Sequence, residues 1–263
     1  ALDNLCLLMQ VFIVNRGRYA EFFGPDATYT SQAIGTNLKA PDSDFFFRVM
    51  ASEEEIKPLR DNTTPEAHDA SRGYVAGFNR YIREIKDGQH TGRHTTCRDA
   101  DWLLAVEEND MWRRYRRLGL LASSAFLAEG ISQAQPPVNA AKANPKKTTQ
   151  IILAKRNRHE ILNKLPVSSE MEMGSNMWGI GSDSTTMGAP LLFVNPHFPW
   201  AGTERLYMMH LTIPSQMDIM GSGLYGFPAI LIGMNEKFAW SHTVSTAYRF
   251  GIYELNMVGP TSY

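Results

Sequence analysis

The chain has little cysteine, no long apolar run and no excess of either charge. Only Cys6 and Cys97 are cysteines among its 263 residues, so it is not a small disulfide-stapled scaffold. Composition alone favours two buried thiols, with one long-loop disulfide as the alternative. No apolar run reaches the roughly 18 residues that a membrane-spanning helix needs. The 26 basic and 27 acidic residues give a net charge of −1, which predicts neither a nucleic acid nor an anionic membrane as partner.

A signal peptide is also missing from the N-terminus. The chain begins at Ala1 without a methionine and stops at Tyr263 just after an expected strand, so we interpret both ends as cut. The chain nevertheless has ample apolar content, because 43% of the residues are hydrophobic. That content suffices for one large or two small globular units and excludes disorder.

Residues 1–137 have the apolar spacing of helices. Three helices are expected: one from Leu5 to Tyr19 that Gly24 stops, one from the Thr64-Pro65 cap to Gly88, and one from Asp101 to Pro136-Pro137. Between the first two, Asp42–Met50 predicts a loop and a short helix. The arginines of the third helix are interpreted as a solvated face whose stems cover apolar surface: Arg113, Arg114, Arg116 and Arg117.

The composition changes twice after the helical stretch. Residues 138–174 are rich in Asn, Lys, Pro, Thr and Ser, which predicts an exposed linker and a natural site for cutting. The next stretch contains short runs typical of strands: 178–181, 191–194, 206–211, 217–220, 230–233, 239–244 and 252–257. Helices followed by many strands predict an α+β fold and argue against a doubly wound sheet.

The Gly174-Ser175 junction stands where the linker meets the first of these strands. A hydroxyl is a weak nucleophile unless a base lies next to it, and a free N-terminal amine can be that base. An α-amine titrates near pH 7.7–8.0, so much of it is neutral at working pH. His197 follows 22 residues later in a proline-flanked turn. The pattern predicts a serine that becomes a new N-terminus, with a histidine beside it.

Two other groupings have motif-like spacing: Gly221-x-Gly223-x-x-Gly226, and His90 and His94 with Cys97. The glycine pattern resembles a dinucleotide-binding loop, but the fingerprint needs a helix opening there, and Pro228 indicates a turn between strands. The histidine–cysteine group lacks a fourth ligand at a recognisable distance, so a zinc site is not expected.

Four segments of the second half resemble the start of the β-subunit of penicillin-acylase-type N-terminal-nucleophile hydrolases: Gly174–Trp178, Leu192–Trp200, Tyr207–Pro214 and Phe238–Val244. Segments of the first half resemble the α-subunit of the branch that contains N-acyl-homoserine lactone acylases and aculeacin acylases: Leu2–Cys6, Glu21–Asp26, Gly73–Tyr81 and Cys97-Arg98. The resemblance covers nearly the whole chain. It implies an αββα four-layer sandwich, incomplete here, with a helical α-subunit portion (1–137), a spacer (138–174) and the N-terminal part of the β-subunit (175–263).

The resemblance also implies that the protein cuts itself. Ser175 attacks the Gly174 carbonyl, an N→O acyl shift gives an ester, and water releases the new N-terminus. A second cut removes the spacer. In the mature enzyme Ser175 attacks the amide carbonyl of an acylated amine. His197 matches the position that holds the serine and its α-amine in place.

Three more positions are implied in the same way. Val244 matches the residue whose backbone N–H donates to the oxyanion, and Phe198 and Leu224 match positions that line the acyl pocket. The family's second oxyanion donor lies beyond residue 263. The carboxylates with which some penicillin acylases bind calcium are absent after Val244, so neither a metal nor another cofactor is expected.

The implied function is an amide hydrolase that removes a fatty acyl chain from an N-acyl amine, with N-acyl-homoserine lactones, the quorum-sensing signals, as the expected substrate. The alternatives are aculeacin-type lipopeptides, β-lactam amides, or a catalytically incomplete fragment. The expected partners are the small-molecule substrate and the remainder of the β-subunit, in an α/β heterodimer formed by self-cleavage, without nucleic acid or membrane. Export of the family implies a periplasmic or secreted protein and a disulfide between Cys6 and Cys97.

Overall fold

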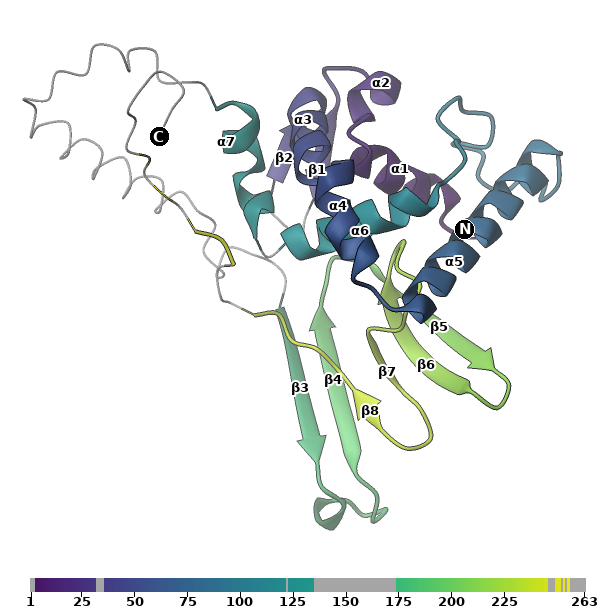
Figure 1. The fold of residues 1–263 in the computed structure, drawn as a ribbon. Helices are drawn as coiled ribbons and strands as arrows, with labels where there is room; N and C mark the ends of the chain where they lie inside the picture. The colour runs from purple at the N-terminus through teal and green to yellow at the C-terminus, as the bar shows by residue number, and fades with distance from the viewer. Residues whose placement is uncertain are drawn as a thin grey trace, which may run out of the picture.

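The computed structural model describes residues 3–31, 36–121, 123–134, 174–245, 249–251, 253 and 255. The fold is α+β, with the helices gathered in one body and the two larger groups of strands extending from one side of it (Figure 1). The helices are α1 (Leu5–Asn15), α2 (Tyr19–Phe23), α3 (Ala40–Met50), α4 (Glu53–Asp61), α5 (Pro65–Lys86), α6 (Glu108–Leu120) and α7 (Ala128–Ser132). The linker expected at 138–174 lies outside the described residues except for Gly174.

Helix α1 lies at the centre of the core. It is apolar around most of its circumference and buries seven apolar side chains, as expected of a core helix: Leu5, Leu8, Met9, Val11, Phe12, Ile13 and Val14. Helix α5 packs Phe78 and Ile82 into the same cluster, and α6 adds Met111. Tyr225, from the strand-rich half, is buried with them, so the two halves share one core.

The helix predicted from Leu5 to Tyr19 is interrupted. Helix α1 ends at Asn15 and α2 begins at Tyr19, because Gly17 has a positive φ of 64° that breaks the helical path. The Asp44 carboxylate accepts hydrogen bonds from the backbone N–H groups of Tyr19 and Ala20 at 2.6 and 2.9 Å, which satisfies the new helix start. Asp44 belongs to helix α3, so the short helix predicted within Asp42–Met50 is confirmed, and the loop predicted with it is wrong.

Helix α6 begins seven residues later than the predicted start at Asp101. Glu107 and Asp110 form a capping box, in which each side chain accepts from the other residue's backbone N–H, and this fixes the first turn. The preceding residues instead form turns, with Leu103 buried in the core. Asp110 also receives two hydrogen bonds from Arg16, at 2.8 and 2.5 Å, which ties α6 to the end of α1.

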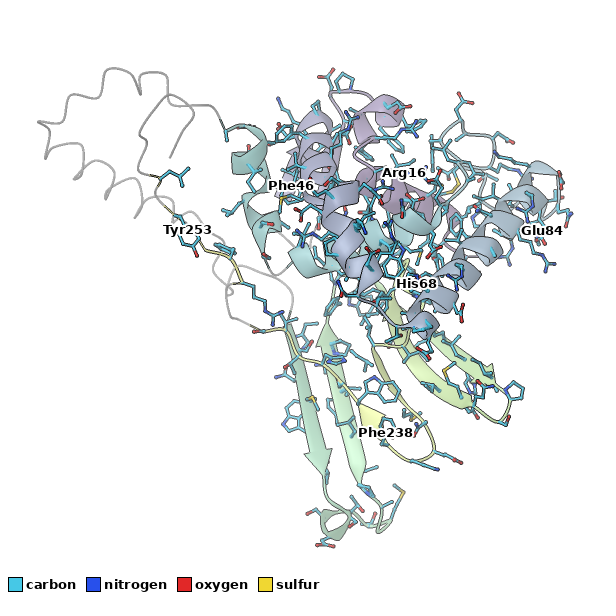
Figure 2. All side chains as sticks on the ribbon, in the orientation of Figure 1. Arg16, Phe46, His68, Glu84, Phe238 and Tyr253 are labelled. Carbon is cyan, nitrogen blue, oxygen red and sulfur yellow. A yellow bond between two sulfur atoms is a disulfide. The ribbon has the colours of Figure 1, made fainter. Side chains whose placement is uncertain are left out.

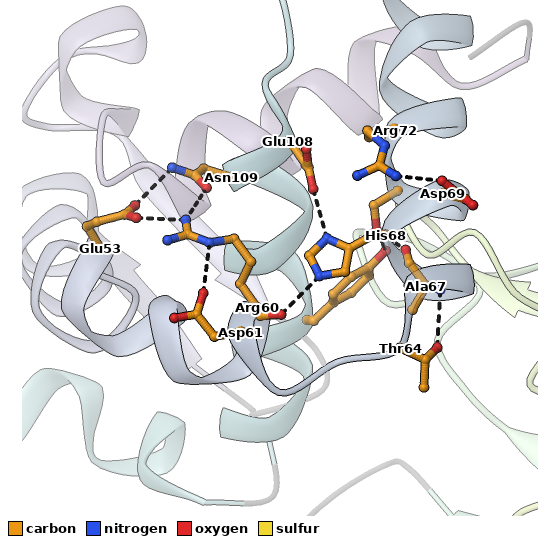
Figure 3. Close-up of polar contacts among 12 residues, drawn as sticks. Glu53, Arg60, Asp61, Thr64, Ala67, His68, Asp69, Arg72, Glu108 and Asn109 are labelled. Atoms are coloured by element: carbon orange, nitrogen blue, oxygen red, sulfur yellow. Dashed lines mark hydrogen bonds and ion pairs between the residues drawn. The ribbon is translucent and has the colours of Figure 1, made fainter.

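A polar network holds α4, α5 and α6 together (Figure 3). His68 on α5 lies 3.2 Å from Glu108 Oε1 on α6 through Nδ1, and 3.1 Å from the Arg60 carbonyl oxygen on α4 through Nε2. Arg60 in turn donates to Glu53 and Asn109. Thr64 caps α5 by accepting from the Ala67 N–H, as the Thr-Pro signal predicts.

The described strands form three antiparallel groups. Strands β1 (Thr28–Ser31) and β2 (Thr36–Lys39) make a small pair that the sequence pattern did not indicate. Strands β3 (Gly174–Ile180) and β4 (Leu191–His197) form a hairpin, and β5 (Leu206–Ile213), β6 (Met217–Leu224), β7 (Ile232–Met234) and β8 (Ala239–Trp240) form a four-stranded sheet. The strand predicted at 239–244 is shorter because β7 offers only three residues as its partner. The one predicted at 252–257 falls mainly outside the described residues.

The glycine-rich motif lies on β6 and the turn after it, not at the start of a helix. A side chain at Gly221 would begin 2.1 Å from the Ile232 carbonyl oxygen, and one at Gly223 would begin 2.5 Å from that of Ala229. The glycines therefore allow neighbouring backbone segments to approach closely, which accounts for the spacing without a dinucleotide.

Cys6 and Cys97 form a disulfide with a Cα–Cα distance of 5.6 Å. The bridge joins α1 to the loop before α6 and is visible among the side chains of Figure 2. The pairing implied by the resemblance is therefore present, whereas the thiol interpretation from composition is wrong. Because Cys97 is oxidised, it has no thiolate to offer to a metal beside His90 and His94.

A buried ionic cluster joins α6 to the strand-rich half. Arg117 donates to Glu204 at 2.5 Å and to the hydroxyl of Tyr29. Arg114 donates to the carbonyl oxygens of Tyr225 and Thr203 at 2.9 and 3.3 Å. Both arginines and Glu204 are at most 1% exposed, so the solvated helix face predicted for these arginines is wrong. We call Tyr29, Arg114, Arg117, Thr203, Glu204 and Tyr225 the arginine cluster.

The charges of the arginine cluster shift one another's ionisation. Burial raises the pKa of Glu204, but Arg117 and then Arg114 more than offset this, so the pKa lies below the usual range of a glutamate. Burial, together with the charge of Arg117, lowers the pKa of Arg114 to about 10. Because the pKa of Glu204 is depressed, its contribution to stability is complete above about pH 4.3, the unfolded value, and is lost as the pH falls through the folded value.

None of the helices in the described part of the chain is both long and apolar enough to cross a membrane.

Replacing Glu204 with Gln is expected to lower the free energy of unfolding by about 3–5 kcal/mol, because it leaves a buried guanidinium without its counter-charge. The double change Arg117→Met with Glu204→Leu should recover most of that loss. Urea unfolding of the three proteins measures both effects. Glu55→Gln is the matched control, since it breaks an ion pair of the same helix with exposed side chains (Arg116–Glu55, 33% and 44% exposed) and should leave the midpoint nearly unchanged. A Glu204→Gln protein that is as stable as the double variant would contradict this account of the cluster.

Replacing both cysteines with serine removes a cross-link between positions 91 residues apart. The expected cost is about 2–5 kcal/mol, because the unfolded chain regains the entropy of an open loop. Thermal unfolding of the wild-type protein with and without a thiol reductant, compared with the double variant, measures this cost. If the wild-type protein melts at the same temperature with and without the reductant, the disulfide contributes nothing to stability.

Candidate active site at the Gly174–Ser175 junction

The β3–β4 hairpin brings the predicted serine and histidine together. In its antiparallel register Gly174 pairs with His197 and Ser175 pairs with Pro196. Directly opposite residues of an antiparallel pair lie about 4.5–5.5 Å apart, so Gly174 and His197, which are 23 positions apart in sequence, become neighbours, and Ser175 stands next to that pair. The prediction that the serine strand pairs with the strand leading to His197 is therefore confirmed.

The serine hydroxyl lies against the peptide bond that precedes it. Ser175 Oγ donates a hydrogen bond to the Gly174 carbonyl oxygen, and Ser175 is half-buried at the start of β3. A hydroxyl in this position can reach its own preceding carbonyl carbon through a five-membered ring. The local geometry thus allows an N→O acyl shift at Gly174–Ser175.

The histidine lies over the glycine. A Cβ added to Gly174 would come 3.2 Å from His197 Nδ1, which is tighter than an ordinary van der Waals contact. Glycine is therefore the residue that lets the imidazole approach the junction. The other ring nitrogen, Nε2, lies 3.0 Å from the Asn195 side-chain nitrogen.

The remaining predicted site residues come from other parts of the fold. Phe198 directly follows β4 and is half-buried. Leu224 is buried at the end of β6, opposite Leu206. Val244 lies beyond β8 in an irregular segment and is half-buried, so the strand expected to carry it to the site ends earlier. The oxyanion role of Val244 and the pocket roles of Phe198 and Leu224 stay predictions.

Asn195 is the site residue that sequence reasoning missed. It stands two positions before His197 on the same strand, and alternate residues of a strand share a face. That spacing was visible in the sequence. The spacing alone does not show that the two residues belong to one strand rather than to a proline-flanked turn.

An α+β chain that opens a strand with a glycine–serine junction, and sets a histidine across from it, has the arrangement expected of the N-terminal-nucleophile class of hydrolases. A sequence model of the penicillin amidase family matches residues 1–263. The chain belongs to the penicillin amidase family.

Several acylases are similar to it. The acyl-homoserine lactone acylase PvdQ of Pseudomonas fluorescens is 34% identical over 266 residues, which is 100% of this chain and 32% of that protein. The PvdQ of Pseudomonas savastanoi pv. phaseolicola is 35% identical over 98% of this chain and 31% of its own length. The aculeacin-A acylase of Actinoplanes utahensis is 34% identical over 99% of this chain and 32% of its own. The chain thus spans about a third of the length of the relatives that it matches.

Replacing Gly174 with Ala in the full-length protein is expected to slow the self-cleavage that the family resemblance implies at this junction, about tenfold. The new Cβ pushes the imidazole away, and small displacements of reacting groups cost this much or more. Gly179→Ala is the matched control, because a Cβ on this other glycine of β3 meets nothing within 4 Å. Electrophoresis of the intact protein and its two cleavage products over time gives the rates. Equal rates for both variants would contradict the steric role of Gly174.

Proposed function

We propose that this chain is the nucleophile-bearing part of an amide hydrolase that removes an acyl chain from an N-acyl amine. The observation that carries the proposal is the juxtaposition of Ser175 Oγ, the Gly174 carbonyl and His197 on one hairpin. Membership of the penicillin amidase family and the acylase relatives support it. In this proposal the protein is made as a zymogen and matures by autoproteolysis.

The first reaction is the self-cut. Ser175 Oγ bonds to the Gly174 carbonyl carbon as the C–N bond breaks, and the proton lost by Oγ is balanced by the proton gained by the Ser175 nitrogen. This shift frees the Ser175 amine, and water then hydrolyses the ester, which regenerates the Ser175 hydroxyl and releases Gly174 as a carboxylate. A second cut within the spacer leaves an α/β heterodimer.

The second reaction uses the amine that the first one exposes. The neutral α-amine of Ser175 takes the hydroxyl proton, so Ser175 can attack the amide carbonyl of a substrate without a histidine–carboxylate relay. His197 holds the serine and its amine in place. The Val244 backbone N–H donates to the oxyanion, a contribution of about 2.7–4 kcal/mol for a donor of this kind. The second donor comes from the remainder of the β-subunit.

The proposed substrates are N-acyl-homoserine lactones, because that is what the names of the PvdQ relatives state. Such an activity would quench quorum sensing. Phe198 and Leu224 are the proposed wall of the acyl pocket, where each buried methylene contributes about 0.8 kcal/mol. The alternative substrates are lipopeptides of the aculeacin type, which the Actinoplanes relative supports, and β-lactam amides.

The exposed apolar surface of the β3–β4 hairpin supports the remainder of the β-subunit as a partner. Met177 is 41% exposed and its neighbour Trp178 is 53% exposed, and adjacent residues of a strand point to opposite faces. Side chains project freely on both sides of this hairpin in Figure 2. A sheet that is apolar on both faces needs a covering layer on each, as in the αββα sandwich that we propose for the complete protein.

A periplasmic or secreted location is part of the proposal. The Cys6–Cys97 disulfide supports it, since disulfides form and persist in oxidising compartments.

Ser175→Ala in the full-length protein is expected to abolish both chain separation and hydrolysis of N-acyl-homoserine lactones, because one hydroxyl performs both attacks. Ser182→Ala, an exposed serine just beyond β3, is the control and should retain both. Mass spectrometry of the products and release of free homoserine lactone are the two measurements.

The outcomes separate the candidate functions. A β-chain that starts at Ser175 but hydrolyses only lipopeptides or β-lactam amides supports the alternative substrates. Normal cutting in Ser175→Ala refutes the self-cutting mechanism, and a wild-type full-length protein that is neither cut nor active supports a catalytically incomplete chain.

A further inference from the structure

We propose that Asn195 is a positioning residue of this site, whose side-chain amide holds His197 in the Nδ1–H tautomer with that N–H facing the Gly174–Ser175 junction. The inference rests on the proposed function and deepens it, because it states which proton the histidine presents at the bond to be cut. His197 then acts at this junction as a hydrogen-bond donor rather than as a base.

The Asn195 contact determines the tautomer. The side-chain nitrogen of Asn195 lies 3.0 Å from His197 Nε2, and both residues belong to the same face of β4. An amide nitrogen donates hydrogen bonds and does not accept them. Nε2 must therefore accept, which leaves the proton of the neutral ring on Nδ1.

The position of the ring then fixes where that proton lies. His197 is opposite Gly174 in the strand register, and a Cβ on Gly174 would come 3.2 Å from Nδ1. Nδ1 is thus the ring atom next to the junction, and Nε2 is turned away from it toward Asn195. A donor beside a carbonyl under attack stabilises the negative charge that develops on its oxygen.

Strands β3 and β4 carry no other titratable group that would set the ring differently. Their sequences, GSNMWGI and LLFVNPH, contain no Asp, Glu, Lys or Arg. Within the described ranges, Asn195 is the one hydrogen-bond partner that the structure gives the His197 ring. The tautomer therefore depends on a neutral amide, which Asn195→Asp replaces with an isosteric acceptor.

Nitrogen NMR of the full-length Ser175→Ala protein, labelled at histidine, reads the tautomer of His197 in the uncut state. We expect the Nδ1–H form, and we expect the Nε2–H form after Asn195→Asp is added, because a carboxylate accepts from Nε2. Asn176→Asp is the matched control. Asn176 pairs with Asn195 across the hairpin, so this substitution places the same negative charge next to the site. An Nε2–H form in the parent, or the same form with and without Asn195→Asp, overturns the proposal.

Cutting rates give a second readout, in which Asn176→Asp separates the lost donor from the added charge; the tautomer is the readout that a purely structural role would not change. In protein with Ser175 present, Asn195→Asp should slow self-cleavage about tenfold at neutral pH, the effect of one hydrogen bond lost at the reacting group. Asn176→Asp should be cut at the wild-type rate.

An Asn195→Asp rate equal to that of the wild type overturns the proposal. Failure of the proposed function looks different: Ser175→Ala would still be cut, or the intact protein would not be cut at all. The tautomer measurement needs no cutting and remains decisive in either case.

Discussion

The buried Arg117–Glu204 ion pair is the interaction on which the arrangement of the two halves depends. It joins α6 to the residues just before β5, across 87 positions of sequence, and both side chains are at most 1% exposed. A buried ion pair adds little net stability compared with apolar side chains, but it is intolerant of misplacement, because either charge alone is costly. Tyr29 and Arg114 extend the same cluster to the first strand pair and to the turn after β6. The helical body and the sheet are therefore held in one relative position by directional bonds as well as by the shared apolar core.

The position of the arginine cluster also bears on the candidate site. Thr203 and Glu204 follow His197 by six and seven residues, so the chain that leaves β4 is fixed at its next buried point. At the other end, the register of β3 with β4 sets Gly174 against His197. The β3–β4 hairpin sets the local geometry of the site, and the buried cluster holds the segment of chain that follows β4 in place. In the proposed function, Arg114 and Arg117 act on the site through placement and do not contact the reacting atoms.

The sequence allowed some features to be predicted and concealed others for physical reasons. The Thr64-Pro65 cap rests on local chemistry, and the pairing of the Ser175 strand with the strand that leads to His197 rests on strand patterns; both are present in the structure. The burial of Arg114 and Arg117 could not be predicted, because charged residues on a helix usually face water and their partner Glu204 is distant in sequence. The helix break at Gly17 depends on Asp44, which is distant in sequence. Composition left the disulfide undecided, because the presence of two cysteines does not show whether they lie close together. The positions of Val244 and Leu224 relative to Ser175 depend on tertiary contacts that no local pattern encodes.

The proposed cut falls where the fold can tolerate it. Among the described strands, β3 pairs with β4, and β5 to β8 pair with one another. Apart from Gly174, the first residue of β3, all of these strands lie on the C-terminal side of the Gly174–Ser175 bond. Cleavage there removes no strand from its sheet. What it does remove is the covalent link between the helical body and the strands, and the arginine cluster together with the Tyr225 packing must then hold the two chains without it. A charge pair that is intolerant of misplacement suits this task, because it stabilises one docking position of the two chains and disfavours the others.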